Sequence, residues 1–166
     1  MNVLILSIIL QFLQTSSGSS EFTFLKGDEK SNNKIALLTL RGPILNEPYN
    51  LIDIDLFGSQ NIIYVNKIKD TLSKIEKENV KGLVISVNSP GGSVSATYNL
   101  YNILKNFKSN NNIKIYFHTN ELLASGGYWM ALASDKIFAN YGSLIGSIGV
   151  KGPDWIYYDS PIAISN

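Results

Sequence analysis

Residues 83–93, LVISVNSPGGS, decide the fold of this chain. The mostly apolar run 83–87, LVISV, predicts a buried strand. Pro90 fixes its own φ and holds the residue before it extended, so the strand has to stop there. The glycine pair 91–92 lets the chain turn with a bare backbone, and Ser93 can cap a helix that follows. The stretch therefore predicts a strand, a tight turn and a helix.

Strand-like and helical patterns alternate on both sides of this stretch. Apolar residues at helical spacing predict one helix with Val65, Ile68, Leu72 and Ile75 on its buried face, and a second with Ala96, Leu100, Ile103 and Phe107. Further apolar segments lie at residues 35–40, 113–117, 137–139 and 145–150, a short apolar helix is expected to end at Ala133, and 46–60 is expected to be a loop. Buried strands alternating with helices predict an α/β fold, with a mostly parallel sheet and flanking helices.

The turn at residues 88–93 has its own chemistry. A strand-to-helix corner with a bare backbone aims unpaired N–H groups, supported by the helix dipole, at one point. That point could hold a phosphate, a carboxylate or the oxyanion of acyl transfer. The spacing differs from the phosphate-binding and dinucleotide-binding glycine motifs. A plain structural turn is the alternative.

A second small-residue corner occurs at residues 122–129, LLASGGYW. A nucleophilic serine needs access, a base and donors for the developing oxyanion. The small neighbours of Ser125 give access, and the amide of Gly126 is a candidate donor. The alternative is that Ser125 is a helix N-cap. If both corners follow strands of one parallel sheet, they meet at the same edge, which favours the catalytic interpretation.

Four motifs occur in order: GPI at 42–44, NSPGGSV at 88–94, ASGGY at 124–128 and GSIGV at 146–150. Together they resemble the signal peptide peptidase A (SppA) family of serine peptidases, which has a ClpP/crotonase-like fold. The resemblance covers about residues 34–150. It implies that Ser125 is the nucleophile and that the Gly92 and Gly126 amides form the oxyanion hole. It further implies that Gly91 supports the turn and that Ser147 helps to hold a catalytic lysine.

The general base is the part of the resemblance that this sequence does not contain. The family uses a Ser/Lys dyad whose lysine lies several dozen residues after the nucleophile, which is beyond Asn166. The domain is therefore expected to be incomplete at its C-terminal end. Lys151 is a weak candidate for a substitute base, and a solvated lysine is the alternative. His118 is expected to be structural or exposed, because related Clp-type peptidases take their histidine from after the nucleophile.

The N-terminal segment differs from the rest of the chain. Residues 3–13, VLILSIILQFL, are fewer than the roughly 20 that a membrane-spanning helix needs, but they match the apolar region of a secretory signal. No Lys or Arg precedes them, and a buried or amphipathic helix is the alternative. We expect a signal or anchor-like segment at 1–20, a polar linker at 21–33 and the peptidase domain at 34–166. A membrane-associated or exported location follows, with the cytoplasm left open.

Composition excludes several function classes. The chain has 166 residues, 45% of them hydrophobic, which is enough for one domain with a buried core. A net charge of +1 argues against nucleic-acid binding. The absence of cysteine excludes disulfides and thiolate chemistry, and one histidine excludes a multi-histidine metal centre. We expect no cofactor and no metal. Asp135 and Glu121 are expected to be loop or helix-end charges without a partner.

The resemblance implies a serine endopeptidase that cleaves remnant signal peptides or other apolar, unfolded segments. It also implies a peptide substrate, a homo-oligomeric ring and membrane association. Two alternatives stay open: a non-catalytic scaffold subunit, and a crotonase-like acyl-CoA enzyme on the same fold.

Overall fold

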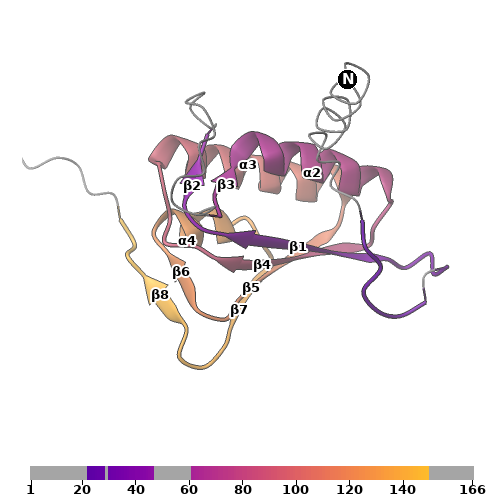
Figure 1. Cartoon of the computed structure of the whole chain (residues 1–166). Helices are drawn as coiled ribbons and strands as arrows, with labels where there is room; N and C mark the ends of the chain where they lie inside the picture. The colour runs from indigo at the N-terminus through magenta and orange to yellow at the C-terminus, as the bar shows by residue number, and fades with distance from the viewer. Residues whose placement is uncertain (1–21, 29, 47–60, 150–166) are drawn as a thin grey trace, which may run out of the picture. The chain divides into compact units, whose positions relative to one another are not determined.

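The computed structural model describes residues 22–28, 30–46 and 61–149 (Figure 1). The chain divides into two compact units, Met1–Asn33 and Lys34–Asn166. The described residues of the first unit form turns and bends, with no helix or strand among them. The apolar segment predicted at 1–20 lies outside the described residues, and the limits 1–20, 21–33 and 34–166 stay predictions. Among the helices that are described, none has both the length and the apolar character needed to cross a membrane.

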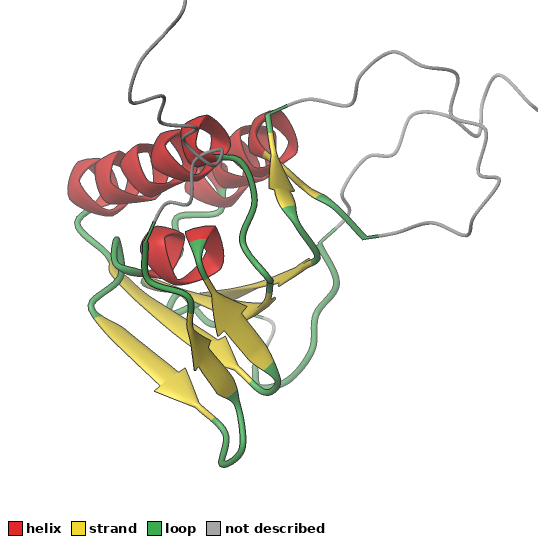
Figure 2. Ribbon diagram, turned by 90° about the vertical axis from the view of Figure 1, so that its left-hand side faces the viewer, coloured by secondary structure: helices red, strands yellow, loops and turns green. Residues whose placement is uncertain are grey.

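The second unit is built on a four-stranded parallel sheet. Its strands are β1 (Ile35–Arg41), β4 (Gly82–Asn88), β5 (Lys114–Thr119) and β7 (Lys136–Ala139), in the order β1-β4-β5-β7. The register places Leu38 beside Ile85, and Ile85 beside Phe117. Ile85 and Phe117 are fully buried. The predicted α/β class with a mostly parallel sheet is confirmed (Figure 2).

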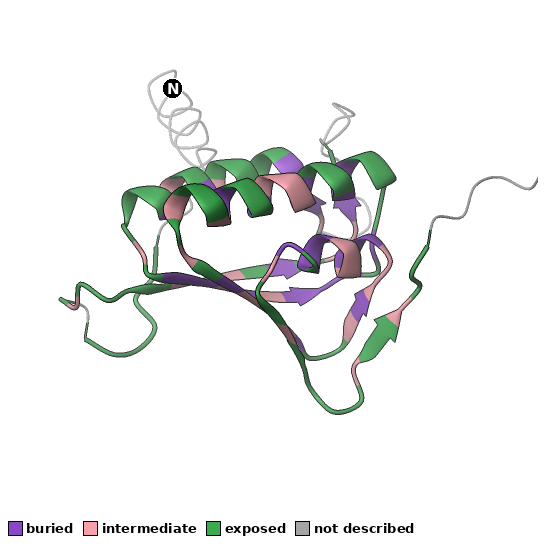
Figure 3. Cartoon of the chain, turned by 180° about the vertical axis from the view of Figure 1, so that it is seen from behind, coloured by how far each residue is buried: buried purple, intermediate pink, exposed green. Residues whose placement is uncertain are grey.

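Helices α2 (Val65–Lys77) and α3 (Val94–Asn111) lie along one face of this sheet (Figures 1 and 3). The buried face of α2 is the predicted one. On α3 the prediction was wrong at one position, because Leu104 is fully buried while Ile103 is only partly buried. The buried residues of α3 are Ala96, Thr97, Leu100, Leu104 and Phe107, spaced to form one continuous stripe.

Two small parallel sheets brace the loops at the ends of the main strands. One pairs β2 (Ile44–Leu45) with β3 (Ile63–Tyr64), and the other pairs β6 (Leu122–Ala124) with β8 (Leu144–Gly146). The sequence analysis did not predict β2, β3 or β6, and residues 47–60 of the predicted loop lie outside the described residues. These short strands bring the carboxyl end of β4 beside the start of helix α4 (Gly126–Ala131), where the candidate site lies.

Candidate active site

Ser125 occupies the sharp bend between β6 and α4. Its backbone has φ 50° and ψ −124°, a region that residues with a side chain rarely adopt. The bend is held by two hydrogen bonds: the Ser125 N–H donates to the Gly146 carbonyl at 2.9 Å, and its carbonyl accepts from the Trp129 N–H at 3.0 Å. The Ser125 side chain makes no capping hydrogen bond to α4. Ser125 therefore stands at the N-cap position of α4 without capping the helix through its hydroxyl, whereas the predicted cap at Ser93 accepts from the Ala96 N–H at 3.2 Å.

The glycine-rich turn after β4 lies directly against this bend. Gly91 has φ +99°, and a Cβ atom on it would lie 2.7 Å from the Gly126 amide nitrogen and 3.0 Å from the Ser125 Oγ. A side chain at position 91 is thus excluded both by the backbone conformation and by the lack of space. The two glycine-rich corners that were predicted to share one edge of the sheet are in contact.

The backbone N–H groups of the turn are nearly all used. The N–H groups of Ser89 and Ser93 donate to main-chain carbonyls, and that of Gly91 donates to the Ser89 Oγ at 3.1 Å. The N–H of Gly92 makes no hydrogen bond to any residue that the structure describes, and the same holds for Gly126 at the start of α4. Two donors that no described residue occupies therefore remain close to the Ser125 hydroxyl.

The direction of the Gly92 N–H is fixed by the other end of its peptide group. The Gly91 carbonyl, which belongs to that group, accepts from the Ile44 N–H at 2.9 Å. In a trans peptide the C=O and N–H point in opposite directions, so the Gly92 N–H points away from β2. Gly92 lines the same pocket as Ser125. Two amide donors beside a hydroxyl form an arrangement that can stabilise an oxyanion.

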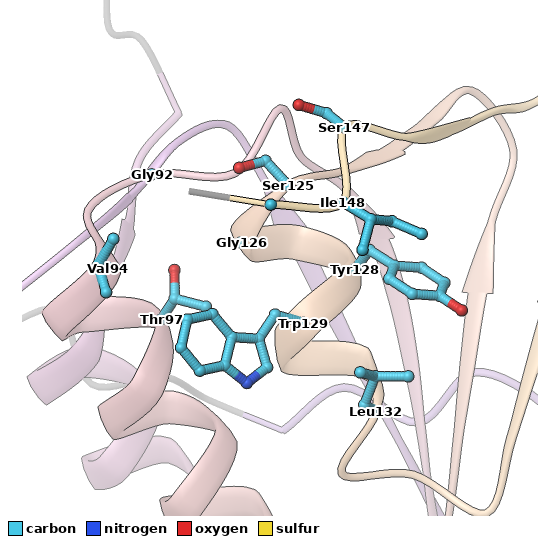
Figure 4. A pocket seen from close by; sticks show the side chains of 11 residues that line it. Gly92, Val94, Thr97, Ser125, Gly126, Tyr128, Trp129, Leu132, Ser147 and Ile148 are labelled. Atoms are coloured by element: carbon cyan, nitrogen blue, oxygen red, sulfur yellow. The ribbon is translucent and has the colours of Figure 1, made fainter. Parts of the chain in front are cut away.

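Ser125 opens into a pocket of about 370 Å³ between α3, α4 and the segment after β8 (Figure 4). Its described lining contains no carboxylate, amine or imidazole; the lining residues are Gly92, Val94, Thr97, Ser125, Gly126, Tyr128, Trp129, Leu132, Ser147, Ile148 and Gly149. Thr97 is fully buried, and its Oγ1 has no hydrogen-bond partner among the described residues. The pocket is therefore mostly apolar, with aliphatic hydroxyl groups at Ser125, Thr97 and Ser147 and a phenol hydroxyl at Tyr128.

The predicted site residues fall in different places. Ser125, Gly92, Gly126 and Ser147 line the pocket, and Gly91 packs behind Ser125. Lys151 lies outside the described residues. The sequence analysis did not predict that apolar side chains of α3 and α4 line the pocket. The signal that could have shown this was the helical spacing of apolar residues after each glycine-rich corner.

Comparison with known proteins agrees with this geometry. Residues 107–159 match Peptidase family S49. A putative signal peptide peptidase SppA from Enterococcus faecium is 35% identical over 136 residues, which are 80% of this chain and 38% of that protein. Protease 4 from Haemophilus influenzae is 30% identical over 119 residues, covering 71% of this chain and 18% of its own length.

The resemblance to the SppA family is confirmed. The S49 match includes Ser125 and Ser147. A solved membrane protease from Pyrococcus horikoshii, 1510-N, which is specific for a stomatin homolog, has a TM-score of 0.52 at 19% identity. That match covers 70% of this chain and 50% of the solved one and supports the fold. This chain spans less than two fifths of the length of the SppA relative.

Other ionisable groups of the described chain lie outside the pocket lining. His118, on β5, places its Nε2 3.1 Å from the Asn140 Oδ1. The expectation that Glu121 has no partner was wrong, because its carboxylate accepts from the Asn88 Nδ2 at 3.3 Å. Within the described ranges, no group of three or more His, Asp or Glu side chains could hold a metal ion.

Asp135 also has partners, contrary to the expectation. Its carboxylate accepts from the Ile115 N–H at 2.9 Å and pairs with Lys114 at 3.1 Å and Lys108 at 3.8 Å. The Ile115 N–H is the largest cause that lowers the pKa of Asp135, and the two lysines lower it further. These contacts join β5 to β7 and to the end of α3, so Asp135 has a structural role.

Proposed function

We propose that this chain acts as a serine endopeptidase in which Ser125 is the nucleophile and the amides of Gly92 and Gly126 form the oxyanion hole. The observation that supports this most is the pair of N–H groups, without a hydrogen-bond partner among the described residues, next to a strained, pocket-lining serine. Strained residues of this kind are concentrated at functional sites. Preorganised donors of this kind act where charge develops in the transition state.

In the proposed reaction the Ser125 Oγ attacks the carbonyl carbon of a peptide bond, and a base accepts the hydroxyl proton. The carbonyl oxygen becomes an oxyanion that accepts hydrogen bonds from the two amides. Collapse of this intermediate breaks the C–N bond, and the base returns the proton to the leaving amine. Water then hydrolyses the acyl-serine ester by the same route and regenerates Ser125.

The base in this proposal is a neutral lysine amine, supplied from beyond residue 166 or by Lys151. A lysine can accept the proton of serine only when burial disfavours its ammonium form, which lowers its pKa. The described lining of the pocket is largely apolar, which suits this requirement. Ser147, which also lines the pocket, is proposed to hold that amine by a hydrogen bond.

We further propose apolar, unfolded segments as substrates, including remnant signal peptides. The name of the Enterococcus faecium relative, a signal peptide peptidase, suggests this class. The pocket itself supports it, because Val94, Leu132 and Ile148 line it and are 49%, 52% and 78% exposed. Exposed apolar side chains around a cavity favour an apolar partner. Membrane association and assembly into a ring belong to the same proposal.

The two alternative functions make different demands on the pocket. A crotonase-like hydratase needs acid and base groups for proton transfer, and the described lining contains no carboxylate. A non-catalytic scaffold subunit would keep the fold without a reactive serine. Reactivity of Ser125 therefore separates the proposed peptidase from both alternatives.

A fluorophosphonate probe on the full chain tests this proposal. We expect covalent labelling of Ser125, at a rate that rises with pH as the amine becomes neutral, and none in Ser125→Ala. Ser134→Ala is the matched control, because it removes a hydroxyl that hydrogen-bonds to Ala131 outside the pocket. Labelling should be unchanged in that control. No labelling of Ser125 from pH 7 to pH 10, or equal labelling of Ser125→Ala, would contradict the proposal.

A further inference from the structure

We propose that Ser89 is a positioning residue that holds the Gly92 amide and Ser125 in the relative positions that the reaction needs. This inference rests on the proposed peptidase function. Ser89 is fully buried and is not among the residues that line the pocket. It therefore acts through its neighbours rather than by touching a substrate.

The Ser89 hydroxyl connects two separate loops. It donates to the Gly42 carbonyl at 2.8 Å and accepts from the Gly91 N–H at 3.1 Å. Both hydrogen-bonding functions of the hydroxyl are thus used. The bond to Gly91 fixes the peptide group immediately before the one that carries the Gly92 N–H. Together with the bond from Ile44 to the Gly91 carbonyl, it holds both peptide groups of Gly91 in place.

The main chain of Ser89 is tied to the strand that carries Ser125. The Ser89 N–H donates to the Leu122 carbonyl at 2.8 Å, and the Ser89 carbonyl accepts from the Ala124 N–H at 3.0 Å. These bonds pair Ser89 with β6, which ends one residue before Ser125. One residue therefore orients an amide donor through its side chain and the nucleophile through its backbone.

The packing around Ser89 leaves little room for adjustment. A Cβ atom on Gly127 would lie 3.0 Å from the Ser89 Cβ and 3.1 Å from the Ser89 carbonyl oxygen. Gly127 follows Gly126 in α4, so Ser89 also lies against the helix that carries the second donor. Loss of the Ser89 hydroxyl would leave the Gly91 N–H and the Gly42 carbonyl without this partner. The Pro90–Gly91 peptide group would then lose this anchor, and the Gly92 N–H would be held in its direction only by the bond between the Ile44 N–H and the Gly91 carbonyl.

The Ser89→Ala variant tests this inference with an internally quenched apolar peptide as substrate. Deleting an oxyanion donor outright lowers kcat by about 10² to 10³-fold. Misdirecting one donor should cost less, so we expect kcat to fall by about 10-fold or more with KM within about twofold. Affinity for a peptide aldehyde of the same sequence, which forms a tetrahedral adduct, should fall in parallel with kcat/KM. A purely structural role would lower the folded fraction, but it would leave kcat/KM per folded enzyme and the affinity for the aldehyde unchanged.

Two further variants keep the test decisive. Ser89→Cys keeps the branching of the side chain and a weak donor and acceptor, so its kcat should lie between those of the wild type and Ser89→Ala, even if the alanine variant folds poorly. Ser134→Ala loses a part-buried hydroxyl that also hydrogen-bonds to main-chain carbonyls, and it should keep the wild-type kcat and aldehyde affinity. An unchanged kcat in folded Ser89→Ala or Ser89→Cys, or a rise in KM with no change in kcat, would overturn the inference. If the wild type neither cleaves the peptide nor reacts with fluorophosphonate, the proposed function fails first and this inference fails with it.

Discussion

Gly91 and Ser125 lie so close that a Cβ atom on Gly91 would come within 2.7 Å of the Ser125 Cβ. Real Cβ atoms do not approach other heavy atoms this closely, so even one methyl group would push the turn after β4 away from the bend before α4. The separation between the Gly92 amide and the Ser125 hydroxyl is therefore set by a glycine that contributes no atom to the pocket lining.

We expect Gly91→Ala to lower both stability and Ser125 reactivity. An alanine at φ +99° costs about 1–2 kcal/mol from its backbone alone, and the overlap with Ser125 and Gly126 adds to that cost. Urea unfolding measures the stability, and fluorophosphonate labelling of the folded fraction measures the reactivity. The labelling rate should fall at least 10-fold.

Gly142→Ala is the matched control for this prediction. Gly142 has φ +85°, and a Cβ atom there would meet nothing within 4 Å. The control should therefore lose only the stability that an alanine at positive φ costs, and it should keep the wild-type labelling rate. Equal labelling of Gly91→Ala and Gly142→Ala would show that the close approach at Gly91 is not needed.

Much of this site could be predicted because its chemistry lies in short, local motifs. Pro90 and the glycines around it fix a turn whatever the rest of the chain does. The contacts that complete the site depend on pairs far apart in sequence, such as Ile44 with Gly92. A two-residue strand like β2 has too few residues to show a period, so its sequence does not reveal it. Thr97 was missed for a different reason, since a buried hydroxyl on an apolar helix face looks like an interruption of the pattern.

Thr97→Val should leave the free energy of unfolding unchanged or raise it by up to about 1 kcal/mol. The Thr97 Oγ1 is buried without a partner among the described residues, and a buried unpaired polar group is destabilising. Thr119→Val is the matched comparison, because Thr119 is equally buried but donates to the Asn88 Oδ1 at 2.9 Å. That variant should lose about 1 kcal/mol or more in urea unfolding. A similar loss in both variants would mean that the Thr97 hydroxyl has a partner.

Asp135→Asn should reduce the stability of the fold at neutral pH and change how that stability depends on pH. Because its hydrogen bonds and lysine neighbours lower the pKa of Asp135 below 3.8, its carboxylate stabilises the folded state above about pH 4. That stabilisation is lost as the pH falls through the lowered pKa. The difference between the wild type and Asp135→Asn, measured by urea unfolding at pH 7, 5 and 3, should therefore shrink at the lowest pH. Asp70→Asn, at an exposed position of α2, should show a smaller difference at pH 7, and a constant gap for Asp135→Asn at all three pH values would contradict the argument.

Ser125→Gly should be more stable than the wild type, although it removes the proposed nucleophile. The backbone of Ser125, at φ 50° and ψ −124°, costs about 1–3 kcal/mol for a residue with a side chain, and glycine adopts it without that cost. Elsewhere in a fold, glycine is destabilising by about 0.5–1 kcal/mol because it gains more freedom on unfolding. The net expectation is a gain of about 1 kcal/mol in urea unfolding, while Ser125→Ala keeps the strained backbone and should match the wild type. A loss of stability in Ser125→Gly would show that Ser125 is not strained, because only relief of strain can reverse the usual sign for glycine.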